Sequence, residues 1–151
     1  MNANTFKNQK GFTLAEIMIV IGIIMIVAVI AIPAMVRGKL NGNEAGAIAA
    51  IKTLGNACNL YLFQNSDFPP DLPTLSSASP PYVSSNLTNT SQTNPKDGYY
   101  YTYALVGTTG FRIIGRPSRW RTTGVRSLSV DQTGRLLYCN TAATCNPTLD
   151  L

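Results

Sequence analysis

The chain has 151 residues and a formal net charge of +5, from 12 Lys and Arg against 7 Asp and Glu. This length suits one domain, and the mildly basic charge is not that of a dedicated nucleic-acid-binding protein. The sequence contains no histidine, so the commonest general base and the commonest metal ligand in proteins are both missing. The acidic residues are scattered along the chain, without a nucleophile-base pair or a metal-ligand cluster. Composition therefore predicts a protein that is not an enzyme and that has no cofactor or metal.

An apolar run from Ile17 to Val36 dominates the first part of the chain, after a polar leader at residues 1–11. The run carries no charged residue, and about 20 residues span ~30 Å as a helix, which matches the hydrocarbon core of a bilayer. We therefore expect residues 12–36 to cross a membrane, with the lysines of the leader kept on the cytoplasmic side. Glu16 stands at the edge of this run, where a carboxylate without a partner is costly. A positive group is expected beside it.

Two residues inside the span weaken a helix. Pro33 lacks a backbone donor and clashes with the preceding turn, whereas Gly22 adds backbone entropy. We expect a bend at Pro33. The alternative is that the span tolerates both residues, as membrane helices often do.

Residues 37–65 extend the helix as an amphipathic segment of a globular head. Apolar side chains recur there at spacings of three and four, which places them on one helix face. These residues are Ile48, Ile51, Leu54, Cys58 and Leu62. We expect the helix to end near Gln64, because two prolines follow shortly after it. Glycines also recur at every fourth position, which either admits another helix closely or reflects loose helix composition. They are Gly38, Gly42 and Gly46.

The rest of the chain predicts a loop and a sheet. Residues 66–98 are rich in Pro, Ser, Asn and Thr, and we expect an irregular loop because the prolines oppose regular helix. Residues 99–139 alternate between apolar and polar with period two, with turn sequences at 107–110 and 131–134. About four antiparallel strands packed on the helix give an α+β fold. Residues 140–151 form a C-terminal loop and tail.

Three cysteines occur in the sequence. Cys139 and Cys145 lie close together near the C-terminus, on the side of the membrane where disulfides form, and we predict a bridge between them. Closing so short a loop stabilises the fold by ~2 kcal/mol. Cys58 lies on the apolar helix face and is expected to be a small buried side chain.

A cluster of arginines surrounds the single tryptophan and suggests an alternative function. Such a basic patch with one stacking ring is typical of a nucleic-acid surface, although it also suits a solvated, salt-bridging face. The residues concerned are Arg112, Arg116, Arg119, Trp120, Arg121 and Arg126.

The segment from Lys10 to Glu16, followed by the apolar run, resembles the processing site of type IV prepilins and of type II secretion pseudopilins. The resemblance implies that a prepilin peptidase cuts between Gly11 and Phe12 and methylates the new amino terminus. It also implies a pilin-like fold. The freed amine of Phe12 then lies about one helical turn from Glu16 and could pair with it, in the same chain or in a neighbour. We predict that this pairing sets the axial register during assembly.

Family resemblance further implies a filament subunit that assembles with copies of itself from the bacterial inner membrane. Its leader lies in the cytoplasm and its head in the periplasm before assembly. The implied partners are prepilin peptidase, an inner-membrane assembly platform and a secretin. The cysteine pair and the long loop favour a type IV pilus, for adhesion, motility or DNA uptake, over a type II secretion pseudopilus. Major pseudopilins use calcium, and Asp131 or Asp150 could contribute, but the usual spacing is not visible.

Overall fold

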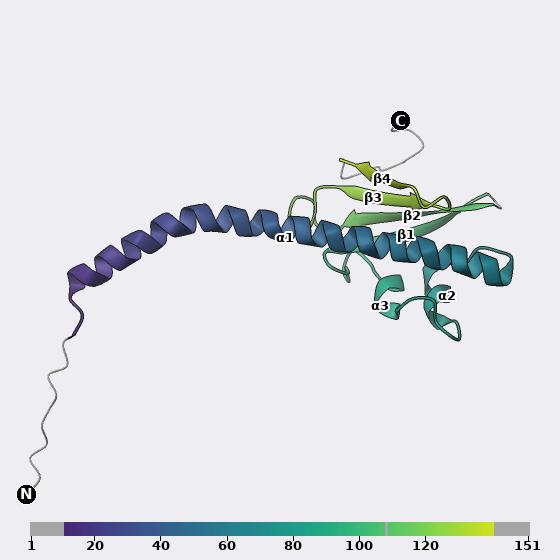
Figure 1. Cartoon of the computed structure of the whole chain (residues 1–151), viewed down its shortest axis with the longest axis horizontal. Helices are drawn as coiled ribbons and strands as arrows, with labels where there is room; N and C mark the ends of the chain where they lie inside the picture. The colour runs from purple at the N-terminus through teal and green to yellow at the C-terminus, as the bar shows by residue number, and fades with distance from the viewer. Residues whose placement is uncertain (1–10, 108, 141–151) are drawn as a thin grey trace, which may run out of the picture. The chain divides into compact units, whose positions relative to one another are not determined.

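The computed structural model describes residues 11–107 and 109–140. The chain divides into two compact units, Met1–Arg37 and Gly38–Leu151, and the second is called the head below. Helix α1 (Leu14–Asn65) contributes residues to both units (Figure 1). It ends one residue after the predicted Gln64. Gly22 and Pro33 both lie inside it, and the predicted bend at Pro33 stays a prediction.

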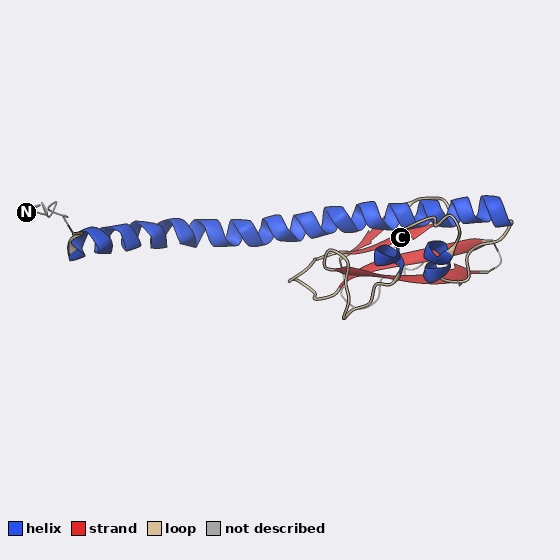
Figure 2. Ribbon diagram, turned by 90° about the horizontal axis from the view of Figure 1, so that it is seen from below, coloured by secondary structure: helices blue, strands red, loops and turns tan. Residues whose placement is uncertain are grey.

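The head is built on one antiparallel sheet of four strands in the order β1-β2-β3-β4. Each strand pairs with the next one along the chain. Their bounds are Tyr99–Val106 for β1, Gly110–Pro117 for β2, Ser127–Asp131 for β3 and Leu136–Cys139 for β4. Figure 2 shows the sheet along the part of α1 that belongs to the head. The predicted α+β, pilin-like architecture is confirmed.

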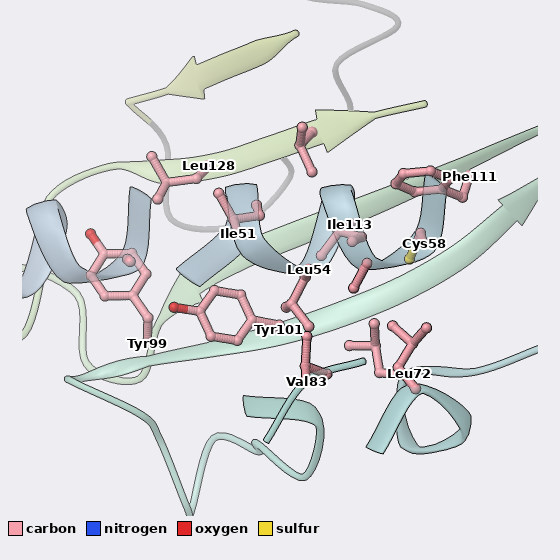
Figure 3. Close-up of a cluster of buried hydrophobic side chains, with 14 of the residues drawn as sticks. Ile51, Leu54, Cys58, Leu72, Val83, Tyr99, Tyr101, Phe111, Ile113 and Leu128 are labelled. Carbon is pink, nitrogen blue, oxygen red and sulfur yellow. The ribbon is translucent and has the colours of Figure 1, made fainter. Parts of the chain in front are cut away.

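The core lies between the apolar face of α1 and one face of the sheet (Figure 3). From the helix, Ile51, Leu54 and Cys58 are fully buried, as the three- and four-residue spacing predicts. From the sheet, alternate residues face the helix, and Tyr99 and Ile113 are fully buried. Each large apolar side chain removed from water in this way contributes about 1.5–3 kcal/mol. This packing fixes the face that the helix turns to the sheet.

Two short helices interrupt the segment predicted as an irregular loop, so that prediction was wrong in part. Helix α2 (Leu72–Ser77) begins after Asp71, whose carboxylate Oδ1 accepts a hydrogen bond from the Thr74 backbone N at 2.9 Å. Helix α3 (Ser85–Thr88) follows. Pro73 lies in the first turn of α2, where its missing N–H costs nothing. The prolines therefore start a helix here as well as opposing one.

The predicted glycine ridge is divided between two environments. A Cβ atom at Gly38 or Gly42 would meet nothing within 4 Å, so both positions are open to a neighbouring helix. At Gly46 the Cβ atom would lie 3.6 Å from the side chain of Asp97, so that glycine already faces the head. Only the first two members remain available for close helix packing.

Candidate processing and assembly site

The predicted cleavage bond lies just before the start of α1. Gly11, Phe12 and Thr13 are exposed and precede the helix, which begins at Leu14. Phe12 is 83% exposed, and a Cβ atom built at Gly11 would have no described group within 4 Å apart from its chain neighbours. The remainder of the leader, residues 1–10, lies outside the described residues. The described side of the bond is thus open to a peptidase.

Glu16 and Thr13 form a reciprocal capping box at the start of α1. The Glu16 carboxylate Oε2 accepts hydrogen bonds from the Thr13 backbone N at 2.8 Å and from the Thr13 hydroxyl at 2.9 Å. In return, the Glu16 backbone N donates to the Thr13 hydroxyl at 3.2 Å. These bonds satisfy donors that every helix start leaves without partners. The carboxylate therefore has local partners in the uncut chain, in addition to the predicted pairing with the Phe12 amine, which stays a prediction.

This capping box was missed by the sequence analysis, although its signal was present. Thr13-Leu14-Ala15-Glu16 has the spacing of a capping box, with a hydroxyl residue followed three positions later by a glutamate. The charge of Glu16 alone does not reveal the cap, which depends on its position in the first turn.

One helix of the described chain, α1, is long and apolar enough to cross a membrane. Its most apolar window has a mean hydropathy of 3.1, and none of that window is buried inside the structure. Large aliphatic side chains at Ile23, Ile26 and Ile30 are all more than half exposed. Such an exposed apolar surface needs a lipid or protein partner.

The residues of the predicted nucleic-acid patch lie in three different places. Arg112 and Arg116 alternate with the buried residues of β2, on the sheet face that points away from α1. Arg119, Trp120 and Arg121 belong to the loop between β2 and β3. Arg126 instead forms an ion pair with Glu44 of α1. The cluster seen in sequence is therefore distributed over several parts of the head.

Glu44 is a charged residue of α1 that is buried. It is 4% exposed, and its carboxylate pairs with the guanidinium of Arg126. The same arginine lies 5.5 Å from the ring centroid of Tyr138, a cation–π contact. This ion pair joins α1 to the end of the β2–β3 loop.

Two of the three cysteines, Cys58 and Cys139, lie among the described residues. Cys58 is a free, fully buried thiol, and burial raises its pKa to about 12. Cys139 closes β4 and is 6% exposed. Cys145 lies outside the described residues, so its pairing with Cys139 stays a prediction.

Among the residues that the structure describes, no group of three or more Cys, Asp or Glu side chains gathers. The carboxylate of Asp131 caps its own turn, accepting from the Thr133 backbone N at 2.8 Å. Asp150 lies outside the described residues.

Comparison with known proteins supports the assignment suggested by the processing motif. Residues 6–32 match the family model of the prokaryotic N-terminal methylation motif. The type II secretion system core protein G of Escherichia coli (strain K12) is 38% identical over 61 residues, which are 40% of this chain and 42% of that protein. Its counterpart in Aeromonas hydrophila is 35% identical over 63 residues, 42% of this chain and 44% of that protein. No solved structure matches the chain.

A third relative is matched over more of its length. The competence protein ComGC of Halalkalibacterium halodurans is 34% identical over 70 residues, which are 46% of this chain and 69% of that protein. The chain spans less than half the length of the core protein G relatives that it matches. With its N-terminal methylation motif, a capped apolar helix and an α+β head, the chain belongs to the type IV pilin and type II secretion pseudopilin family.

Proposed function

We propose that this chain is a pseudopilin of a type II protein secretion system, a structural subunit without catalytic activity that assembles into a filament. The observation that carries the proposal is the similarity to core protein G of type II secretion systems. This reverses the preference for a type IV pilus drawn from the sequence, which depended on the cysteine pair and the long loop.

The proposed mechanism begins with the chain anchored in the inner membrane by residues 12–36. Prepilin peptidase cuts between Gly11 and Phe12 and methylates the new amine. The two members of the capping box remain together on the mature chain, so the helix keeps its start after the cut. The new cation lies beside Glu16, and attraction between opposite charges is strong where water is excluded. That attraction sets the register of a subunit entering the filament, with the assembly platform and the secretin as further partners.

Competence is a second candidate function, favoured by a single observation. The match covers 69% of the competence protein ComGC but only 42% of the core protein G of Escherichia coli. Both candidates use the same processing and the same membrane helix. They differ in what the assembled filament serves.

Deletion of the chain in its own host tests the proposal. We expect loss of export of secreted proteins, restored by the wild-type chain and not by Gly11→Val, which blocks the cut. Mass spectrometry of the complemented strain should find a chain that begins at Phe12 and carries one extra methyl group. Normal export combined with loss of natural transformation would instead support the competence function. Abundant surface filaments made of this chain, with export intact, would support a type IV pilus.

A further inference from the structure

The loop that joins β2 to β3, residues 118–126, is held against the first turns of α1 within the head. The Asn43 side-chain Nδ2 donates a hydrogen bond to the backbone carbonyl of Thr123 at 2.9 Å. The loop is closed on itself by a hydrogen bond from Arg121 N to Gly124 O at 2.9 Å. Tyr99 fixes its far end, since the hydroxyl donates to the carbonyl of Arg126 at 2.9 Å. The loop thus has a defined place on the helix.

Along the chain, that place is the first part of the head after the apolar run. Glu44 is the first buried residue of α1, so the contacts with the loop at Asn43 and Glu44 are where the head begins to pack on its helix. Asn43 follows Val36, the last residue of the apolar run, by about 10 Å of helix. The polar layer on each side of a bilayer is roughly 5–8 Å thick. Only six residues separate Val36 from Asn43, so the chain keeps Asn43, and the loop bonded to it, within reach of the lipid headgroups.

The loop presents basic and amphipathic side chains at this position. Arg119 and Arg121 are exposed, Val125 is 41% exposed, and Trp120 is half-buried. Lys39 is also exposed and lies one helical turn before Asn43, on the same helix face. We call these residues the basal surface: Lys39, Arg119, Trp120, Arg121 and Val125.

Acidic groups do not cancel the charge of the basal surface. Residues 118–126 contain no Asp or Glu. Two carboxylates near the loop are already paired, Glu44 with Arg126 and Asp97 with Lys96. Within the described ranges, no ion pair engages Lys39, Arg119 or Arg121. The surface is left with a net positive charge.

We infer that the basal surface docks the head onto the surface of an anionic lipid bilayer before the subunit leaves the membrane. Lysine and arginine are attracted to anionic headgroups, and tryptophan favours the level of the headgroups because its ring is apolar and its N–H is polar. Docking holds the head in one orientation about the span. The inference requires membrane insertion of residues 17–36, which the proposed function also requires.

Trp120 is the only tryptophan of the chain, so its fluorescence reports directly on the basal surface. The full chain is reconstituted in vesicles of phosphatidylcholine, with or without phosphatidylglycerol, and with a small share of lipid that carries a spin label on its headgroup. We expect emission at shorter wavelength and stronger quenching in the anionic vesicles, both reduced by salt. Arg119→Glu should lower the ratio of docked to undocked heads by roughly 25-fold, at about fivefold for each unit of charge.

Arg135→Glu provides the matched control. Arg135 is exposed and follows the β3–β4 turn, where the Gln132 carbonyl accepts from Asn59 of α1, far along the helix from Asn43. The same charge change at that end of the head should leave Trp120 quenching unaltered. Equal loss of quenching in the two variants would overturn the inference, because it would reflect net charge alone.

Two further outcomes would also overturn it. The first is Trp120 quenching that does not differ between neutral and anionic vesicles, while flotation shows that the chain is inserted in both. That result would leave the proposed function standing. The second is the same lack of difference together with salt-sensitive binding of duplex DNA that Arg119→Glu abolishes, which would assign the surface to nucleic acid instead.

Discussion

Glu16 has two separate reasons to be acidic, and they can be distinguished at the level of one residue. As a member of the capping box it accepts hydrogen bonds from Thr13, at 2.8 and 2.9 Å. As a carboxylate it can also pair with the amine that the predicted cut frees on Phe12. Glutamine serves at this position of a capping box but carries no charge. Replacement by glutamine therefore removes the second role and keeps most of the first.

We expect Glu16→Gln and Glu16→Ala to block filament assembly alike, because in the proposed mechanism the charge of Glu16, and not its role as a cap, sets the register. Membrane insertion and cleavage should stay intact in both variants. Filaments sheared from cells and measured against total mature chain provide the measurement. If Glu16→Gln assembled normally while Glu16→Ala failed, the cap would be the essential role and the charge pairing would be refuted.

Removal of Arg126 should destabilise the head, because it leaves the carboxylate of Glu44 buried without its cation. We expect Arg126→Ala to lower the free energy of unfolding by about 2 kcal/mol, below the range for fully buried pairs, since the Arg126 side chain is 47% exposed. Chemical denaturation of the full chain in detergent, followed by Trp120 fluorescence, measures it. Adding Glu44→Gln should restore part of the loss by removing the buried charge. A double variant less stable than Arg126→Ala would contradict this account.

Cys58 should be inert in the folded protein and reactive once unfolded. Its pKa is raised to about 12 by burial, so the thiol keeps its proton well above pH 8, and only the thiolate reacts. An alkylating reagent at pH 8 without reductant should therefore leave the native chain unmodified. After denaturation without reductant a single cysteine should react, and after reduction all three. Reaction of Cys139 before reduction would refute the predicted disulfide.

The pKa shift of Cys58 also has a consequence for stability at alkaline pH. The folded state retains the proton while the unfolded thiol loses it, so the unfolded state binds fewer protons above its own pKa. Tyr99 acts in the same direction, since burial is the main cause that raises its pKa to about 12. Stability should accordingly be fully present below about pH 9 and should decline from there to about pH 12. The free energy of unfolding can be measured at each pH by denaturant titration with Trp120 fluorescence as the signal. A value that does not change between about pH 9 and about pH 12 would contradict the predicted pKa shifts.

At the scale of elements, hydrophobic periodicity was sufficient to predict the long helix and the sheet. Apolar residues such as Ile51 and Leu54 recur at helical spacing, and the tyrosines from 99 to 103 follow the two-residue period of a strand. Each element can therefore be recognised from the spacing of its buried residues. Helices α2 and α3 were missed because they are too short to show a period. The start of α2 depends on a single cap, Asp71, whose pKa is lowered by its hydrogen bonds to Thr74. Ser84, which precedes α3, makes no side-chain cap hydrogen bond.

Ile51 tests the packing of helix on sheet. Its side chain is fully buried against the sheet, so Ile51→Ala should lower the free energy of unfolding by about 2–5 kcal/mol through lost burial and a cavity. Lys52→Ala, the next residue and an exposed one, is the control and should change stability by less than about 0.5 kcal/mol. Chemical denaturation of both variants in the same detergent measures the two changes in the free energy of unfolding. Similar values for the two would mean that the helix does not pack on the sheet as described.

At the scale of the whole chain, the methylation motif was predictable and the contacts around the loop at residues 118–126 were not. Gly11, Phe12 and Glu16 follow one another within a short motif, which a sequence displays directly. The ion pair between Glu44 and Arg126 joins residues from distant parts of the chain, and no local pattern records it. The arginine cluster shows the same limit, because residues that are close in sequence were predicted to form one surface, whereas the structure distributes them over β2 and the loop that follows it.

Membrane retention of the chain should depend on the first unit alone. We expect a double change of Ile23 and Ile26 to Arg to release the chain into the carbonate-soluble fraction, at a cost of about 3 kcal/mol for each buried charge. The matched control changes Leu60 and Phe63 to Arg, two apolar residues of the head that have the same spacing and are 49% and 87% exposed. That variant should stay with the membrane. Release of both variants, or of neither, would show that the apolar run does not anchor the protein.

The position of the Thr13–Glu16 cap has a consequence for how such chains could be exchanged between hosts. Among the described residues, every hydrogen bond that starts α1 comes from residues beyond the predicted scissile bond. A foreign leader, fused directly before Phe12 and ending in glycine, would thus deliver a mature subunit whose first turn is unchanged. The leader could therefore be replaced, because the mature chain itself contains the residues that start its first helix.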